Sequence, residues 1–205
     1  MFKDMTLNEF TEKIASSDPV PGGGSVSAAA SAIAASLSKM VASLTIGKKK
    51  YIDQETTMKE IFEKSENLRN ILLDYIDKDS QAFNEVMNAF KAPKETDEEK
   101  SKRTTLIQNA TKKAAEVPLN IAKISFEIMQ LAEVVVEKGN KNAITDGAVA
   151  AMMARTGILG ALYNVKINLG SIKDEEYVQR LKKEVETIEN QTKLLEQKIL
   201  TKIDF

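Results

Sequence analysis

Residues 19–46 constrain the fold more than any other part of this chain. The loop Pro19-Val20-Pro21-Gly22-Gly23-Gly24-Ser25 leads into a segment, 25–46, that holds seven alanines, six serines and one charged residue, Lys39. Prolines fix the backbone and glycines free it, which favours a sharp loop whose amides lie close to a ligand or another segment, or whose glycines adopt positive φ. We predict that a long helix of small side chains follows, because other helices can approach such a helix closely.

The larger apolar residues of this segment have helical spacing. They alternate four and three residues apart and form one apolar seam: Val26, Ala30, Ile33, Leu37, Met40 and Leu44. The length and low charge of the segment are also those of a membrane span, but alanine and serine contribute little transfer free energy. We therefore interpret it as a buried helix and predict no membrane association.

Composition excludes several classes of function. The chain has 205 residues, a net charge of −1, no cysteine and no histidine. Disulfides, thiolate chemistry and the usual zinc sites are excluded, so no metal site is predicted. The near-neutral charge gives no overall attraction to nucleic acid or to an anionic membrane. The charged N-terminus has no signal-peptide pattern, so a cytoplasmic protein is expected.

Hydrophobic periodicity predicts helices and no strand of useful length. Capping boxes begin two helices, at Thr6 with Glu9 and at Thr96 with Glu99. Pro118 is expected to kink or restart a helix. We predict an all-α, single-domain bundle of about seven helices over residues 1–205. It packs around two helices rich in small residues, 25–46 and 147–169, the second with the stripe Gly147, Ala150, Ala154, Gly157 and Ala161.

Asp79 interrupts the apolar pattern of the long helix predicted from 53 to 91. It lies between Tyr75 and Phe83, where the three-four rhythm requires an apolar side chain. A carboxylate facing the core costs several kcal/mol unless it is paired, hydrogen-bonded or protonated. Asp79 is therefore either a functional acid or a structural aspartate that is tied to a neighbouring helix or cap.

Other polar residues also break regular patterns. Lys48, Lys49 and Lys50 either hold a carboxylate-rich ligand or form a solvated charge run at a helix end. Asn164 and Asn168 either line a pocket or bond backbone groups in the core. Asn140, Asn142 and Asp146 lie in a polar loop, with Asp146 the predicted N-cap. If the helices 25–46, 53–91 and 147–169 pack together, these residues line one cleft with the glycine loop. Such a cleft suits a polar, anionic heterocycle.

Five ordered motifs together resemble the cyclodeaminase/cyclohydrolase family, which includes formimidoyltetrahydrofolate cyclodeaminases and methenyltetrahydrofolate cyclohydrolases. The resemblance spans nearly the whole chain. The chain is similar to the C-terminal half of the bifunctional formimidoyltransferase-cyclodeaminases. The preceding transferase domain has no counterpart here, so no transfer of substrate between fused sites is expected. The motifs are Pro21-Gly22-Gly23-Gly24-Ser25, Gly47-Lys48-Lys49-Lys50-Tyr51, Asp79-Ser80-Gln81-Ala82-Phe83, Gly139-Asn140 with Asp146, and Asn164-Val165-Lys166-Ile167-Asn168-Leu169.

The resemblance implies an all-helical, homodimeric enzyme that converts 5-formimidoyltetrahydrofolate to 5,10-methenyltetrahydrofolate and ammonia. Asp79 occupies the position of the catalytic acid/base, and the only partner molecule implied is a tetrahydrofolate, with or without a polyglutamate tail; no further cofactor is expected. Methenyltetrahydrofolate cyclohydrolase is the alternative activity, and a non-catalytic helical scaffold is the alternative class. The substrate-binding residues so implied are Gly22, Gly23, Gly24, Ser25, Lys48, Lys49, Lys50, Asn140, Asn142, Asp146, Asn164 and Asn168.

Overall fold

A computed structural model describes residues 1–203 as helices joined by short loops, which confirms the all-α prediction. Asp204 and Phe205, the last residues of the predicted domain, lie outside the described residues. The α-helices are α1 (Leu7–Ile14), α2 (Gly23–Thr45), α3 (Glu55–Phe90), α4 (Asp97–Lys138), α5 (Ile144–Leu169) and α6 (Glu175–Leu200). Three short 3-10 helices are η1 (Phe2–Asp4), η2 (Lys49–Gln54) and η3 (Lys141–Ala143).

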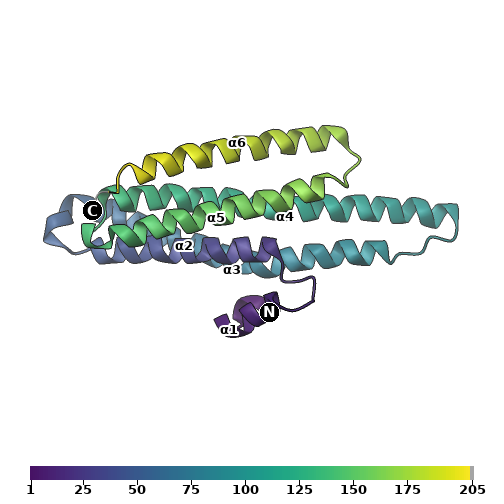
Figure 1. Cartoon of the computed structure of the whole chain (residues 1–205), viewed down its shortest axis with the longest axis horizontal. Helices are drawn as coiled ribbons and strands as arrows, with labels where there is room; N and C mark the ends of the chain where they lie inside the picture. The colour runs from purple at the N-terminus through teal and green to yellow at the C-terminus, as the bar shows by residue number, and fades with distance from the viewer. Residues whose placement is uncertain (204–205) are drawn as a thin grey trace.

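Four long helices, α2 to α5, run along the long axis of the molecule (Figure 1). α2 contacts α3, α4 and α5, while α6 covers α4 and α5 on one side and α1 lies on the opposite side. Where α3 ends and α4 begins, the two helices extend past the rest of the bundle. The core between these helices contains Leu72, Ile121, Met129, Ile158 and Leu162, all almost fully buried. Each such side chain stabilises the fold by about 1.5–3 kcal/mol.

Small residues allow α2 and α5 to pack at close range. A β-carbon on Gly157 would overlap the Ser31 hydroxyl, and one on Gly160 would overlap the Ser27 hydroxyl. Ser31 in turn bonds Ser125 of α4, with 2.6 Å between the two hydroxyl oxygens. Most of the alanines and serines of α2 therefore face the core, although Ser36 and Ser43 are exposed.

The apolar seam of α2 is instead largely exposed. Val26, Ile33, Met40 and Leu44 are 38%, 48%, 38% and 44% exposed, although Ala30 of the same seam is buried. A row of exposed large apolar side chains at heptad spacing is typical of a surface that pairs with another helix. Residues 1–203 leave this surface uncovered.

Pro118 does not divide a helix in two, so the prediction of about seven helices is wrong. α4 runs unbroken from Asp97 to Lys138 through Pro118. Proline has no N–H, so the carbonyl of Ala114, four residues earlier, loses its helical partner. The side-chain amide of Asn168 in α5 donates to that carbonyl at 2.8 Å. A partner from a neighbouring helix thus replaces the lost bond, and the helix continues.

Most helix ends agree with the sequence. Both capping boxes, Thr6 with Glu9 and Thr96 with Glu99, are formed, and Gly139 is the C-cap of α4. The prediction for Asp146 is wrong, because Ala143 is the N-cap of α5 and Asp146 lies in its first turn.

Two stretches, Gly23–Thr45 and Lys141–Leu169, are long and apolar enough to cross a membrane by length and composition, but 61% and 50% of their most apolar windows are buried in the bundle.

Candidate functional site

A pocket of about 340 Å3 lies where the start of α2 meets α3, α4 and α5. It brings together the glycine loop, Asp79 and the two asparagines of α5, as the sequence predicts for these residues. Apolar side chains that the sequence analysis did not assign to a site form its walls. The lining residues are Pro19, Val20, Gly22, Gly23, Asp79, Phe83, Val86, Ala114, Asn164, Ile167 and Asn168.

The Asp79 carboxylate lies directly against the N-terminus of α2. A β-carbon on Gly24 would overlap the carboxylate, so only glycine at position 24 permits this approach. The Ser25 hydroxyl donates to Asp79 Oδ2 at 3.0 Å. The N-cap of α2, Gly22, has no side chain to cap the helix, and no acidic residue occupies its first turn. Asp79 therefore supplies, from α3, the negative charge that a helix N-terminus favours.

Burial raises the pKa of the Asp79 carboxyl above its ordinary value. The Ser25 hydroxyl and backbone N–H oppose this shift by stabilising the ionised form, but desolvation is the larger effect. A carboxyl with a raised pKa exchanges its proton more readily near neutral pH than an ordinary aspartate does. Asp79 thus lies at the N-terminus of α2 and has a raised pKa.

Asn164 and Asn168 have one free acceptor each in the described part of the chain. Asn164 Nδ2 donates to the Gly160 carbonyl at 2.9 Å, and Asn168 Nδ2 donates to the carbonyls of Ala114 and Asn164 at 2.8 and 2.9 Å. These backbone partners fix the orientation of both amides, because only an N–H can face a carbonyl. The two Oδ1 atoms have no hydrogen-bond partner among residues 1–203, so they remain available to a ligand.

The pocket therefore presents acceptors. Its side chains provide one carboxylate and two amide oxygens, and none of the residues that line it is a lysine or an arginine. This environment favours a ligand that is cationic or rich in N–H donors. The lysines expected to hold an anionic heterocycle do not line this pocket within a single chain.

The glycine loop contributes close approach rather than unusual backbone angles. Gly47 is the only glycine with positive φ in the described residues, so the expectation of positive φ in the loop is wrong. Gly22 and Gly23 line the pocket, whereas Gly24 is buried beneath Asp79. Ser25 is fully buried and contacts Asp79 and Ile76. Gly24 and Ser25 therefore position Asp79 and do not reach a ligand.

The remaining predicted site residues lie at the opposite end of α2. Lys48, Lys49 and Lys50 are exposed beyond its C-terminus, where Asn140 Nδ2 donates to the Leu44 carbonyl at 3.0 Å. The 23 residues of α2 separate this end from Asp79 by roughly 35 Å, at 1.5 Å per residue. The prediction that all these residues line one cleft is therefore wrong within one chain.

We call Lys48, Lys49 and Lys50 the lysine group. Among residues 1–203 they form no ion pair within 4 Å, so their charge is available to a partner. Asn140 accepts from the backbone N–H of Asn142 at 3.1 Å, and its own N–H donates to Thr45 at 2.8 Å. Asn140 thus caps the end of α2, while Asn142 is exposed and Asp146 is half-buried nearby.

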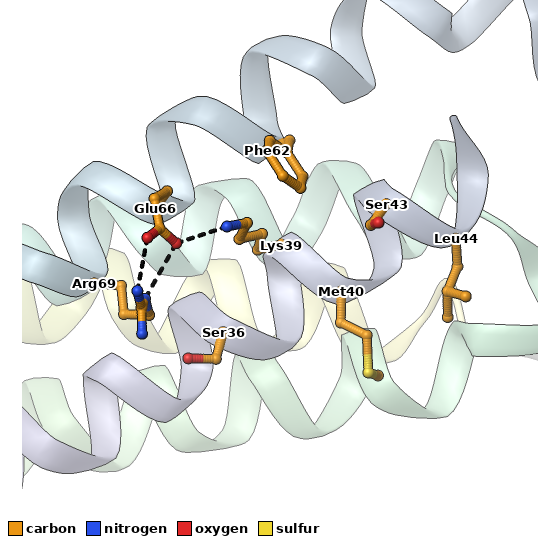
Figure 2. Close-up of a pocket in the computed structure, with 8 residues that line it drawn as sticks. All are labelled: Ser36, Lys39, Met40, Ser43, Leu44, Phe62, Glu66 and Arg69. Carbon is orange, nitrogen blue, oxygen red and sulfur yellow. Dashed lines mark hydrogen bonds and ion pairs between the residues drawn. The ribbon is translucent and has the colours of Figure 1, made fainter. Parts of the chain in front are cut away.

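A second hollow, of about 400 Å3, lies on the outer face of α2 and α3 (Figure 2). Its charges are already paired: Arg69 and Lys39 both donate to Glu66, at 2.6 and 2.7 Å, and these bonds lower the pKa of Glu66 to about 2. Met40 and Leu44 of the exposed seam line the same hollow. Because each charged group that lines this hollow is paired with an opposite charge, the Asp79 pocket is the better candidate for chemistry.

Comparisons with known proteins agree on one family. The family model of formiminotransferase-cyclodeaminase matches residues 6–187. The chain is 44% identical to a methenyltetrahydrofolate cyclohydrolase of Methylorubrum extorquens, over 88% of this chain and 87% of that protein. It is 30% identical to the formimidoyltransferase-cyclodeaminase of Rattus norvegicus, over 93% of this chain but 35% of that longer protein.

A solved structure gives the same result for the fold. The crystal structure of formiminotetrahydrofolate cyclodeaminase from Thermotoga maritima superposes with a TM-score of 0.89 at 34% identity, and the match covers 98% of this chain and 97% of that one. The sequence match and the structural match both extend over the helices that form the Asp79 pocket. The chain therefore belongs to the formiminotransferase-cyclodeaminase family.

Proposed function

We propose that this protein is a formimidoyltetrahydrofolate cyclodeaminase with Asp79 as its acid/base. The supporting observation is a single carboxylate at a helix N-terminus, in a pocket whose other side-chain polar groups are two amide acceptors. The formimidoyl group is an amidine that is protonated at neutral pH, and the methenyl bridge of the product is also a cation. A pocket that has acceptors and no competing cation stabilises both.

Asn164 and Asn168 would bind the pterin ring through their free oxygens. The ring carries an amino group and ring N–H groups, which are the donors that such oxygens accept. Phe83, Val86 and Ile167 provide apolar surface for the ring faces. The folate is the only small molecule that this proposal requires.

The reaction needs one proton to move between two nitrogens of the substrate. N10 attacks the formimidoyl carbon, and a C–N bond forms there as the C=N double bond opens. Asp79 accepts the proton from N10 and delivers it to the former imino nitrogen. That nitrogen then leaves as ammonia, and the N5–C–N10 bridge keeps the positive charge. One positioned carboxyl with a raised pKa is suited to both transfers.

A second candidate activity is hydrolysis of the methenyl bridge. The 44% identity to a methenyltetrahydrofolate cyclohydrolase, over most of both chains, favours it. Asp79 would then accept a proton from the attacking water and return it to N5 as the C–N5 bond breaks, while the remaining hydroxyl proton is released to solvent as the formyl C=O forms. The same pocket and the same carboxyl serve both reactions, since both occur at the carbon between N5 and N10.

An assay with both substrates separates these activities. The purified protein should release one ammonia for each methenyl bridge formed from 5-formimidoyltetrahydrofolate. Loss of the bridge from 5,10-methenyltetrahydrofolate without ammonia would instead identify a cyclohydrolase. No turnover of either substrate, together with no heat of binding for any tetrahydrofolate, would contradict an enzyme and favour a helical scaffold.

We also propose that the protein is a cytoplasmic homodimer, built from the single domain 1–205. The exposed seam of α2 runs from Val26 to Leu44, so it is self-complementary if two copies pair antiparallel about its midpoint, Ala35. Heptad spacing keeps two such helices nearly aligned over their length. The same pairing places the partner subunit's lysine group opposite residues 20–22, beside the Asp79 pocket. The two groups of predicted site residues would then meet between subunits.

Mixing two impaired variants should restore turnover of a polyglutamylated folate at low substrate concentration if the site is shared in this way. One variant is Asp79→Asn, and the other replaces Lys48, Lys49 and Lys50 by alanine. A mixed dimer contains one site with an intact Asp79 and an intact lysine group, so turnover should recover after subunit exchange. A mixture no more active than its components, or sedimentation as a 22.6 kDa monomer at micromolar concentration, would contradict the shared site.

The lysine group should recognise the glutamate tail. Its replacement by alanine should weaken binding of a polyglutamylated folate more than that of the monoglutamate, because each added carboxylate offers the lysines another partner. The difference should shrink as salt is added, since these charges are exposed. Equal losses of affinity for both folates would show that the lysines only offset the negative charge at the C-terminal end of α2.

A further inference from the structure

The Ser25 hydroxyl has more hydrogen-bond partners than it has protons. Its Oγ lies 2.8 Å from the Ile76 carbonyl oxygen, 3.0 Å from Asp79 Oδ2 and 3.1 Å from Ser80 Oγ. A serine hydroxyl has one proton to donate and two lone pairs to accept with. Ser25 therefore donates either to Ile76 or to Asp79, and it accepts from another group at the same time.

The protonation of Asp79 decides between these two arrangements. When Asp79 is ionised, Ser25 donates to the carboxylate, which is the stronger acceptor, and Ser80 donates to Ser25. When Asp79 is protonated, its O–H donates to Ser25, and Ser25 donates to Ile76. The Ile76 carbonyl also accepts the α3 helical bond from the Ser80 N–H, so it keeps a partner in both states.

We infer that Ser25 and Ser80 form a two-position hydrogen-bond relay that follows the proton of Asp79, and that Ser25 is thereby a positioning residue for the acid/base step. The inference rests on the proposed function of the Asp79 pocket. Ser25 is 0% exposed and Ser80 is 3% exposed, so neither reaches a ligand in the pocket. Their effect on the reaction must pass through Asp79.

No other ionisable group among the pocket-lining residues competes with this relay. The lining residues of the glycine loop, α4 and α5 carry no charge. On α3, Asp77 accepts from the Phe2 N–H at 2.7 Å, and the Lys78 ammonium lies over the Tyr75 ring.

The charged residues nearest in sequence on α4 and α5 are paired elsewhere. Lys113 of α4 pairs with Glu85 at 2.6 Å, and Lys166 of α5 pairs with Glu189 at 2.7 Å. On α2, the closest charged residue is Lys39, which pairs with Glu66. A change in the titration of Asp79 can therefore be assigned to the serines.

Ser25→Ala tests the relay. It removes the donor that stabilises ionised Asp79, so the apparent pKa of this carboxyl in the pH profile of kcat should rise by about one pH unit. KM should change little, because Ser25 does not touch the ligand. Ser80→Ala keeps the Ser25 donor but removes the hydroxyl that supports it, so a smaller shift in the same direction is expected. Ser80→Ala also provides the test if Ser25→Ala fails to fold.

Ser31→Ala is the matched control. Ser31 is a fully buried serine of the same helix, and it also bonds one carbonyl, that of Ser27 at 3.0 Å, and one hydroxyl, that of Ser125. It has no carboxylate partner. Ser31→Ala should therefore lower the melting temperature as Ser25→Ala does but leave the pH profile unchanged.

A second measurement does not depend on turnover. The carboxyl infrared band that Asp79→Asn abolishes should titrate at a higher pH in Ser25→Ala than in the wild type, without substrate. An unchanged midpoint in both serine variants would overturn the relay even if the enzyme is active. A shifted midpoint in a protein that turns over no folate would support the relay and contradict the proposed function, so the two failures are distinguishable.

Discussion

Asp79→Asn is expected to lower turnover by roughly two to four orders of magnitude while folate still binds. Asparagine keeps the shape of the side chain and can still accept from Ser25, but it cannot exchange a proton. Turnover, folate affinity and melting temperature of the one variant test this together. Near-normal turnover in a folded Asp79→Asn protein would end the assignment of Asp79 as acid/base.

The stability of this variant should hold or improve at neutral pH. The pKa of Asp79 is higher in the folded state than in the unfolded state, so its contribution to the free energy of unfolding falls as pH rises through that interval. Asparagine removes this pH dependence. Asp77→Asn is the matched control, because Asp77 is buried on the same helix but accepts from the Phe2 N–H outside the pocket. It should reduce stability and leave turnover unchanged.

Gly24→Ala should abolish most activity, with a loss as large as that of Asp79→Asn. The new methyl group would occupy the space of the Asp79 carboxylate, which must move away from the N-terminus of α2. Overpacking of this kind also costs about 1–3 kcal/mol of stability. Gly23→Ala should have a smaller effect, because its methyl group would make a tight contact with the Asn164 side-chain amide, at 3.1 Å, without overlapping it.

A double-mutant cycle identifies the cause of the Gly24 effect. If the methyl group acts on Asp79, then Gly24→Ala should cost much less stability in an Asp79→Ala background, where the overlapping atoms are absent. Chemical denaturation of the four proteins measures this coupling. Additive losses would show that the clash is elsewhere, and that position 24 does not require glycine for the approach of Asp79.

The sequence predicts where the helices of this fold begin and end better than it predicts which side of each helix is buried. Helix ends carry local signals, and the capping box of Thr96 with Glu99 and the C-cap Gly139 act as those signals indicate. Pro118 misleads because the group that replaces its missing N–H, the amide of Asn168, comes from another helix. The seam of α2 has core-like spacing yet is exposed, because spacing defines a face of a helix but not what covers it.

The sequence likewise identifies some residues of the candidate site and not others. Asp79 could be singled out because an acid at an apolar position is a local anomaly, and the structure places it beside Gly23 and Asn164. The sequence could not identify Ser80, or Val86 and Ile167 in the pocket walls, as site residues. A serine or an aliphatic side chain in a helix has no distinguishing pattern. The roughly 35 Å between Asp79 and the lysine group, at 1.5 Å per residue of α2, follows only from the three-dimensional arrangement.

A crystal structure of the Asp79→Asn protein with 5,10-methenyltetrahydrofolate tests the central claim most directly. The pocket between α2, α3 and α5 should hold the ligand, with its methenyl carbon about 3–3.5 Å from the side chain of residue 79, the separation of a near-attack geometry. The free oxygens of Asn164 and Asn168 should accept from the pterin. A folate bound instead in the hollow of Figure 2, beside Glu66 and Phe62, would contradict the account.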